Sequence, residues 1–155
     1  MRKTKTISLL FLLLLVTGKL NAQDNIPYLS PGITLGWNSN GAISISPKIS
    51  LGVIWNGGIY TNITIGAMAT FSKAKYNYEY CELQAGSIRH FISGGAGFAI
   101  THRDNNREVV PKLSLSAGFL LFANLDMAVH PDSVNTNWGI QGVFPIILNK
   151  QFHLN

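Results

Sequence analysis

Residue types that carry out nucleophilic or acid–base chemistry are few in this chain, and they are scattered. The 155 residues include four histidines, at His90, His102, His130 and His153. Asp132 and Ser133 follow His130 closely, so an acid, a nucleophile and a base occur near one another, as in enzymes that act on lipids. A nucleophile needs its base within hydrogen-bond reach, and spacing along the chain does not establish that. We therefore interpret the histidines as solvated loop residues and keep a lipid-modifying enzyme as a lesser alternative.

Known catalytic and ligand-binding motifs are missing from the sequence. It contains neither a G-x-S-x-G elbow nor an H-E-x-x-H helix, and one cysteine with four scattered histidines shows no metal-ligand spacing. The run Gly94-Gly95-Ala96-Gly97 has the glycine content of a phosphate loop, but Phe98-Ala99-Ile100 continues it as a strand where a helix would have to begin. Glycine inside a strand instead lets a barrel bend or makes room for a bulky neighbour. We predict no catalytic residue, no cofactor and no metal site.

The formal net charge of +5 is concentrated at the N-terminus. Four of the twelve cations lie in the first nineteen residues: Arg2, Lys3, Lys5 and Lys19. Without residues 1–22, eight cations face seven anions, a net charge of +1. Nucleic-acid binding needs clustered Lys and Arg, so we exclude nucleic acid as a partner.

Residues 1–22 have the pattern of a secretory signal peptide. Met1–Lys5 is positively charged, Ile7–Val16 is a ten-residue apolar run, and Thr17–Ala22 is small or polar, with cleavage expected after Ala22. Ten residues rise about 15 Å as a helix, half of a ~30 Å hydrocarbon core, so an uncleaved anchor is the alternative. We predict a signal peptide at 1–22 and one domain at 23–155. The sole cysteine, Cys81, has no intramolecular disulfide partner, and we interpret it as a packed small hydrophobe.

Beyond a short leader (Gln23–Pro31), apolar and polar residues alternate with a period of two, which predicts an all-β domain. Asn40-Gly41 and Asn56-Gly57-Gly58 are strong hairpin signals, because Asn and Gly accept positive φ angles. The segment Lys112–His130 must also turn, although little in it marks the position. We predict about eight strands, at 32–38, 42–55, 59–72, 76–88, 92–102, 109–120, 123–130 and 136–148. Longer loops are expected at one end of the sheet, at Thr101–Glu108 and His130–Thr136.

The composition of the two strand faces indicates which of them lies outside. The more polar face is mostly Ser, Gly, Thr and Asn, and the 133 residues after position 22 contain only 15 charged side chains. A water-facing surface normally carries about 25–35 % charged residues, whereas small polar side chains suit the narrow interior of an eight-stranded barrel. The aliphatic face would then meet lipid. Aromatic residues near strand ends share that face, as in interfacial girdles: Trp37, Trp55, Phe71 and Trp138.

Some residues do not fit this simple pattern. Tyr60 falls on the polar face, and Tyr76, Tyr78 and Tyr80 share a stretch in which Glu79 and Glu82 interrupt the alternation. Lys48, Lys112 and Asp126 have the inward parity, with Glu79, Glu82 and Arg89 nearby in sequence. Charges inside a narrow barrel should pair, because an unpaired buried charge is costly. We predict that Asp126 pairs with Lys112 or Lys48 and helps to fill the lumen, leaving no aqueous pore.

These features together resemble the small eight-stranded outer-membrane β-barrel proteins of Gram-negative bacteria. The resemblance rests on the export signal, on alternating strands such as ISISPKISLGVIW and on the glycine-rich GGAGFAI strand. The chain differs from that group in ending Phe152-His153-Leu154-Asn155, because such barrels typically end on an aromatic residue. The resemblance implies an antiparallel up-and-down barrel that spans the outer membrane as a monomer, is not an enzyme, and contacts any extracellular partner through its loops.

One alternative from another class stays open. The same alternation suits a soluble exported barrel, periplasmic or secreted, that binds a small apolar ligand in the manner of lipocalins. That reading requires the aliphatic face to point inward, around the ligand.

Overall fold

The computed structural model describes residues 25–71, 77–103, 106–118 and 121–148, and every described element is a strand or a turn. The predicted export signal (1–22) and the chain end (149–155) lie outside the described residues. The strands, eight long and one short, are β1 (Ile26–Asn38), β2 (Ile43–Ile54), β3 (Ile59–Phe71), β4 (Asn77–Ser87), β5 (Ile92–Arg103), β6 (Asn106–Gly118), β7 (Leu121–Val129), β8 (Val134–Val143) and β9 (Ile146–Ile147).

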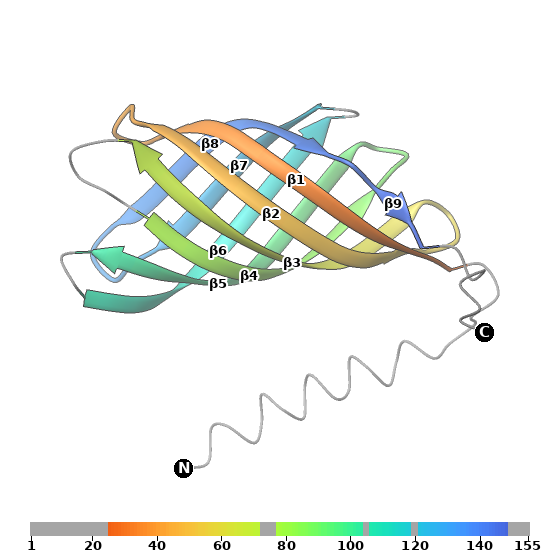
Figure 1. Cartoon of the computed structure of the whole chain (residues 1–155), viewed down its shortest axis with the longest axis horizontal. Helices are drawn as coiled ribbons and strands as arrows, with labels where there is room; N and C mark the ends of the chain where they lie inside the picture. Colours follow the sequence, from red (N-terminus) through yellow and green to blue (C-terminus); the bar gives the residue numbers. More distant parts are fainter. Residues whose placement is uncertain (1–24, 72–76, 104–105, 119–120, 149–155) are drawn as a thin grey trace, which may run out of the picture.

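The strands form a closed antiparallel barrel (Figure 1). Each long strand pairs with its neighbours in sequence, and β1 pairs with both β2 and β8, which joins the two edges of the sheet. β9 continues the line of β8 and pairs with the beginning of β1. The predicted fold class, an up-and-down β-barrel of about eight strands, is confirmed.

No helix long and apolar enough to cross a membrane occurs among the described residues.

Predicted and observed strand limits agree closely in the middle of the chain. The strands predicted at 42–55, 59–72 and 76–88 each match the observed strand to within one residue. The predicted hairpin signals are also confirmed, since Gly41 and Gly57 have φ angles of 75° and 90°. The break expected inside Lys112–His130 exists, since β6 ends at Gly118 and β7 begins at Leu121, each two residues before the predicted limit.

The first strand is longer than predicted. It begins at Ile26 and not at residue 32, so most of the segment interpreted as a leader is part of the barrel. β2 extends far enough to pair Ile54 with Ile26. Two prolines lie in this part of β1 and lack a backbone N–H, but their carbonyls still accept hydrogen bonds. Pro31 accepts from Phe144 (3.0 Å) and Pro27 from Leu148 (2.9 Å).

The last predicted strand, 136–148, is interrupted. β8 ends at Val143 and the chain rejoins the sheet as β9, with Phe144 and Pro145 between them. Pro145 has no N–H to donate to the ladder, which explains a break at this position.

The prediction of a long loop at Thr101–Glu108 is wrong. β5 continues to Arg103 and β6 begins at Asn106, with Thr101 opposite Glu108. Polar side chains suggested a loop, but a ladder is built from backbone groups, and threonine and valine favour it. Among the turns that the structure describes, 39–42 and 130–133 at one end have the same length as 55–58 and 88–91 at the other, so these four turns do not show the predicted bias toward longer loops at one end.

The barrel has a polar interior and an apolar exterior. Among the described residues, nineteen polar or charged residues are buried against seven apolar ones. Aliphatic side chains lie on the outside, with Leu115 61 %, Ile65 58 % and Leu51 58 % exposed. The predicted outward orientation of the aliphatic face is confirmed, and the inward orientation required by the lipocalin-like alternative is wrong.

Inward-facing glycines make room for large inward side chains. Gly66 lies opposite Tyr80 in the ladder, and a Cβ atom added at Gly66 would come within 2.5 Å of the Tyr80 ring. A Cβ at Gly97 would overlap the backbone of Glu82. The structural role predicted for the glycine run is confirmed at Gly97, and Gly66 has a similar role that the sequence did not indicate.

A pair of valine substitutions tests this packing. Gly66→Val should lower the free energy of unfolding by roughly 1–3 kcal/mol, because the added side chain overlaps the buried ring of Tyr80. Ala67→Val, on the exposed outer face of the same strand, should leave it nearly unchanged. Urea unfolding of the refolded barrels, followed by circular dichroism, measures both, and equal losses would contradict the packing described here.

Candidate functional site

The middle of the barrel contains a buried ion-pair cluster of three side chains from three strands. The Lys112 Nζ atom lies 2.7 Å from Glu82 Oε2 and 2.6 Å from Asp126 Oδ1. All three side chains are at most 4 % exposed. Nζ also lies over the Tyr80 ring, 4.4 Å from its centroid. The predicted pairing of Asp126 with Lys112 is confirmed, and Glu82, which the sequence placed only nearby, completes the cluster.

The register of the sheet explains how Lys112 and Glu82 reach each other. They lie on β6 and β4, with β5 between them, and both are directly opposite Gly97. Because Gly97 has no side chain, the two charged groups meet across β5. Asp126 on β7 is opposite Ser114, two residues from Lys112 on the same inward face.

A second lysine reaches the same region from the other side of the barrel. Lys48 donates a 2.5 Å hydrogen bond to the Gln141 Oε1 atom, and the charges of Asp126 and Glu82 also act on it. The alternative pairing of Asp126 with Lys48 is therefore not observed as a direct contact. Two cations and two carboxylates together make the centre neutral, and their burial fills it. Such a centre is suited to closing the lumen.

Hydroxyl and amide groups continue the hydrogen bonding toward both ends of the barrel. On one side of the charged centre, Ser44 donates to Asn137 Oδ1 at 2.5 Å. On the other side, Thr64 donates to Asn62 Oδ1 (3.0 Å), and Asn62 in turn donates to the Tyr28 hydroxyl (2.9 Å).

The candidate catalytic residues are not brought together. His130 Nδ1 lies 3.1 Å from Glu108 Oε2, but Ser133 meets His130 through its backbone carbonyl and not its hydroxyl. His102 lies on β5, opposite Arg107 on the outer face. His90 is at the other end of the barrel, where its Nδ1 hydrogen-bonds the Ser87 hydroxyl (2.9 Å). His153 lies outside the described residues.

Aromatic side chains gather on the outer face at one end of the barrel. Trp37 and Trp138 are register neighbours, with ring centroids 6.4 Å apart. Through Ile43 the row continues to Phe71 on β3. Trp55 lies at the opposite end of the barrel, half-buried in the turn after β2, where it donates to the hydroxyl of the outward-facing Thr61 (2.9 Å).

The stretch that the sequence suggested was irregular does alternate. Tyr78, Tyr80 and Glu82 point inward and are buried, while Glu79 is exposed on the outer face. Tyr76 lies outside the described residues. Cys81, interpreted from the sequence as a packed small hydrophobe, has the outward parity and is half-buried.

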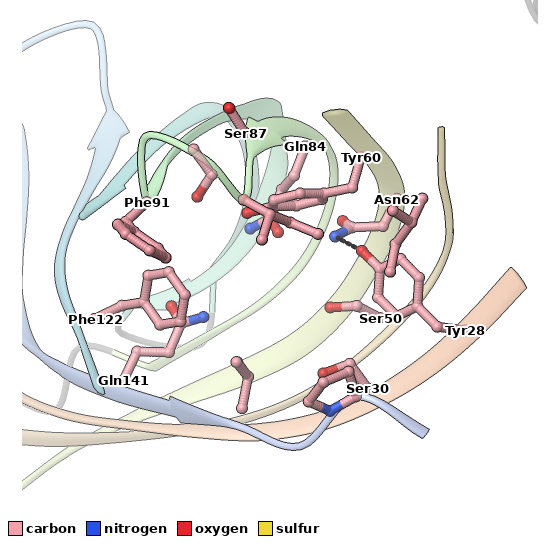
Figure 2. A pocket seen from close by; sticks show the side chains of 15 residues that line it. Tyr28, Ser30, Ser50, Tyr60, Asn62, Gln84, Ser87, Phe91, Phe122 and Gln141 are labelled. Atoms are coloured by element: carbon pink, nitrogen blue, oxygen red, sulfur yellow. Dashed lines mark hydrogen bonds between the residues drawn. The ribbon is translucent and has the colours of Figure 1, made fainter. Parts of the chain in front are cut away.

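Sequence reasoning missed a cavity of about 290 Å³ inside the barrel, at the end where β1 begins and β8 ends (Figure 2). It could not be read from the sequence, because its lining comes from seven strands, from turn 88–91 and from Pro145 after β8. No group of three or more metal-ligating side chains occurs within the described ranges.

Comparisons with known proteins show a likeness of fold. No protein-family model and no curated protein matches the chain. A structure from the de novo design of transmembrane β-barrels matches with a TM-score of 0.49 and 12 % identity, covering 76 % of this chain and 95 % of the other. The designed barrel TMB2.3 gives 0.47 and 15 %, covering 77 % and 96 %. The Yersinia pestis outer membrane protein Ail, in a phospholipid bilayer nanodisc, gives 0.48 and 9 %, covering 77 % and 99 %. Likeness at this level describes the path of the chain and says nothing of activity.

Removing the central cation should destabilise the barrel strongly. Lys112→Met leaves two carboxylates buried without a cation, which typically costs about 3–5 kcal/mol. Lys48→Met leaves the Gln141 carbonyl without its donor and the centre with one excess negative charge, but it breaks no direct ion pair, and it should cost about 1–3 kcal/mol. Urea unfolding at neutral pH measures both values.

A rescue experiment separates charge from shape. Adding Asp126→Asn alone to Lys112→Met leaves the Glu82 carboxylate against Lys48, so the formal charge of the centre is again zero and much of the lost stability should return. If the double variant is no more stable than Lys112→Met, the charge imbalance is not the cause.

Proposed function

We propose that the protein is an integral outer-membrane β-barrel of a Gram-negative cell envelope, exported by the signal peptide at residues 1–22. The exterior of the barrel carries the argument. Twenty-eight of the described residues are large, apolar and exposed, which is far beyond the scattered apolar residues of a soluble surface. Apart from Ile88 and Phe91, none of them lines the cavity. They lie on every strand, so a lipid bilayer is a better partner for this surface than a single protein.

Two further observations support this environment. In the described strands, Glu79 and Arg107 are the charged side chains on the outer face, and both lie near the end that carries Trp37 and Trp138. Closure of the barrel pairs the strand edges, which hydrocarbon requires because it offers no hydrogen bonds. The aromatic row fits a membrane–water interface.

The proposed protein is a monomeric, non-enzymatic component of the envelope. Its neutral, filled centre gives it no route for solutes, so any interaction with a partner outside the cell would use the rim. We assign the rim with turns 39–42 and 130–133 to the outside of the cell. The opposite rim, where β1 begins and β8 ends, is assigned to the periplasm. The lipid-modifying alternative is weaker, because His102 and His130 lie on different faces of the sheet.

Cell fractionation tests the location directly. The protein should pellet with the outer membrane and migrate differently in detergent electrophoresis with and without boiling, because a closed hydrogen-bonded barrel resists detergent. Recovery in the soluble periplasmic or secreted fraction would overturn the proposal.

A matched pair of arginine substitutions tests which surface meets lipid. Leu113→Arg, near the middle of β6 on the outer face, should cost about 2–4 kcal/mol in lipid vesicles, and Val109→Arg, closer to the rim, about 0–1 kcal/mol. Both side chains are exposed, at 43 % and 69 %. In a soluble protein both changes would be small and alike, so urea titration of the two variants distinguishes the environments.

A further inference from the structure

The cavity at the periplasmic rim has the composition of a binding site for an uncharged ligand. Fifteen residues line its volume of about 290 Å³, and none of them carries a formal charge. This is the lower end of the range for small-molecule sites. An ionic ligand would lose its hydration and find no partner there, so the lining selects against charge.

Aromatic rings form two walls of the cavity. Figure 2 shows Phe91 and Phe122 on one side and Tyr28 and Tyr60 on the other. The two tyrosine rings meet edge to face, with centroids 6.4 Å apart. A flat apolar ring fits between such walls, because aromatic side chains offer both faces and edges for contact.

Several polar atoms in the lining remain available. The Lys48 ammonium group can only donate hydrogen bonds, so the Gln141 side chain accepts through Oε1. Its amide N–H groups are left free to donate. The Glu82 carboxylate can only accept, so Gln84 donates to it through Nε2 (2.6 Å). The side-chain carbonyl oxygen of Gln84 is left free to accept. The hydroxyls of Ser93 and Tyr60 have no hydrogen-bond partner in the part of the chain that the structure describes. The lining therefore has both hydrogen-bond donors and hydrogen-bond acceptors available to a ligand.

The two glutamines also separate the cavity from the charged centre. Each has one end on a charged residue of that centre and also lines the cavity. The cavity therefore presents neutral amides although four charges lie close behind it.

A strained residue lies at the mouth. Phe91, in the turn 88–91, has a φ angle of 54°, and no other non-glycine residue of the described chain has a positive φ. This conformation costs a bulky residue about 1–2 kcal/mol relative to the usual one. Glycine would adopt it freely, so the phenyl ring is kept here against the local backbone preference.

We propose that this cavity binds a small uncharged molecule with an apolar ring and a hydroxyl or carbonyl group. The ligand enters from the aqueous end of the barrel, because paired strands close the walls. The ring lies between the aromatic walls, and its polar group bonds the free ends of Gln84 and Gln141 or the neighbouring hydroxyls.

Three probes with the same ring test the specificity for neutral ligands. Benzyl alcohol, benzoate and benzylammonium are titrated at neutral pH into the purified, isotopically labelled protein in detergent micelles. Benzyl alcohol should shift the backbone NMR signals of Tyr60, Gln84, Ser93 and Phe122 saturably, and the charged probes should bind at least about tenfold more weakly. No saturable shift at these residues, or equal binding of the charged probes, would overturn the proposal.

Two variants locate the site. Ser93→Phe fills the cavity and should weaken benzyl alcohol binding about tenfold or more, whereas Ile92→Phe, its neighbour on the outer face, should not. Phe91→Gly suits the local backbone, so it should fold normally while weakening binding by removing one wall. Unchanged binding in both cavity variants would place the probe elsewhere, in the micelle or on the outer surface. Binding that appears only after deletion of residues 149–155 would show that the chain itself occupies the cavity, which also contradicts the proposal.

Discussion

Closure of the sheet by β1 is the constraint on which the rest of this structure depends. β1 pairs with β2 from Ile26 to Trp37 and with β8 from Gly32 to Asn38, so the two edges of the sheet satisfy each other. Once the sheet is closed, every second side chain must enter a narrow space and the others must face outward. The period of two in the sequence then becomes a division between interior and exterior. Small hydroxyl side chains fit this interior better than aliphatic ones, and the aliphatic ones are left to the lipid.

A narrow interior sets strict conditions on its larger residues. Tyr80 fits because Gly66 lies opposite it, and Lys112 meets Glu82 because Gly97 separates them. Glycine weakens a strand by itself, so its cost is offset here by the contacts of the side chains that it admits. Charges under the same confinement must be balanced. The centre satisfies this with two lysines, two carboxylates and the amide of Gln141, all supplied by different strands.

The sequence predicts well which face of the sheet each side chain occupies, and it predicts poorly which side chains contact one another. Alternation alone was sufficient to place Lys48, Lys112 and Asp126 inside. The partner of each charge depends on register, and register is set by closure around the whole barrel, which no local pattern shows. Glu82 is the clearest example, because its role depends on a glycine of the next strand. The start of β1 was missed because a segment with two prolines, Pro27 and Pro31, does not have the sequence pattern of a strand. Only its pairing with β2 and β9 shows that it belongs to the sheet. The polar residues at 101–103 and 106–108 likewise resemble a loop in the sequence, although they pair with one another in the sheet.

The two halves of the lumen differ in how they are filled. Toward the end with Trp37 and Trp138, short polar pairs such as Ser44 and Asn137 lie beside a buried apolar cluster that includes Met68, Tyr78 and Val110. Toward the opposite end, the aromatic rings lie at the barrel wall and leave a cavity of about 290 Å³ between them. Because Gln84 and Gln141 bind the charged centre with one end of each amide, the cavity is neutral and aromatic while the centre beside it is ionic. The same closed sheet therefore keeps two incompatible environments within one lumen.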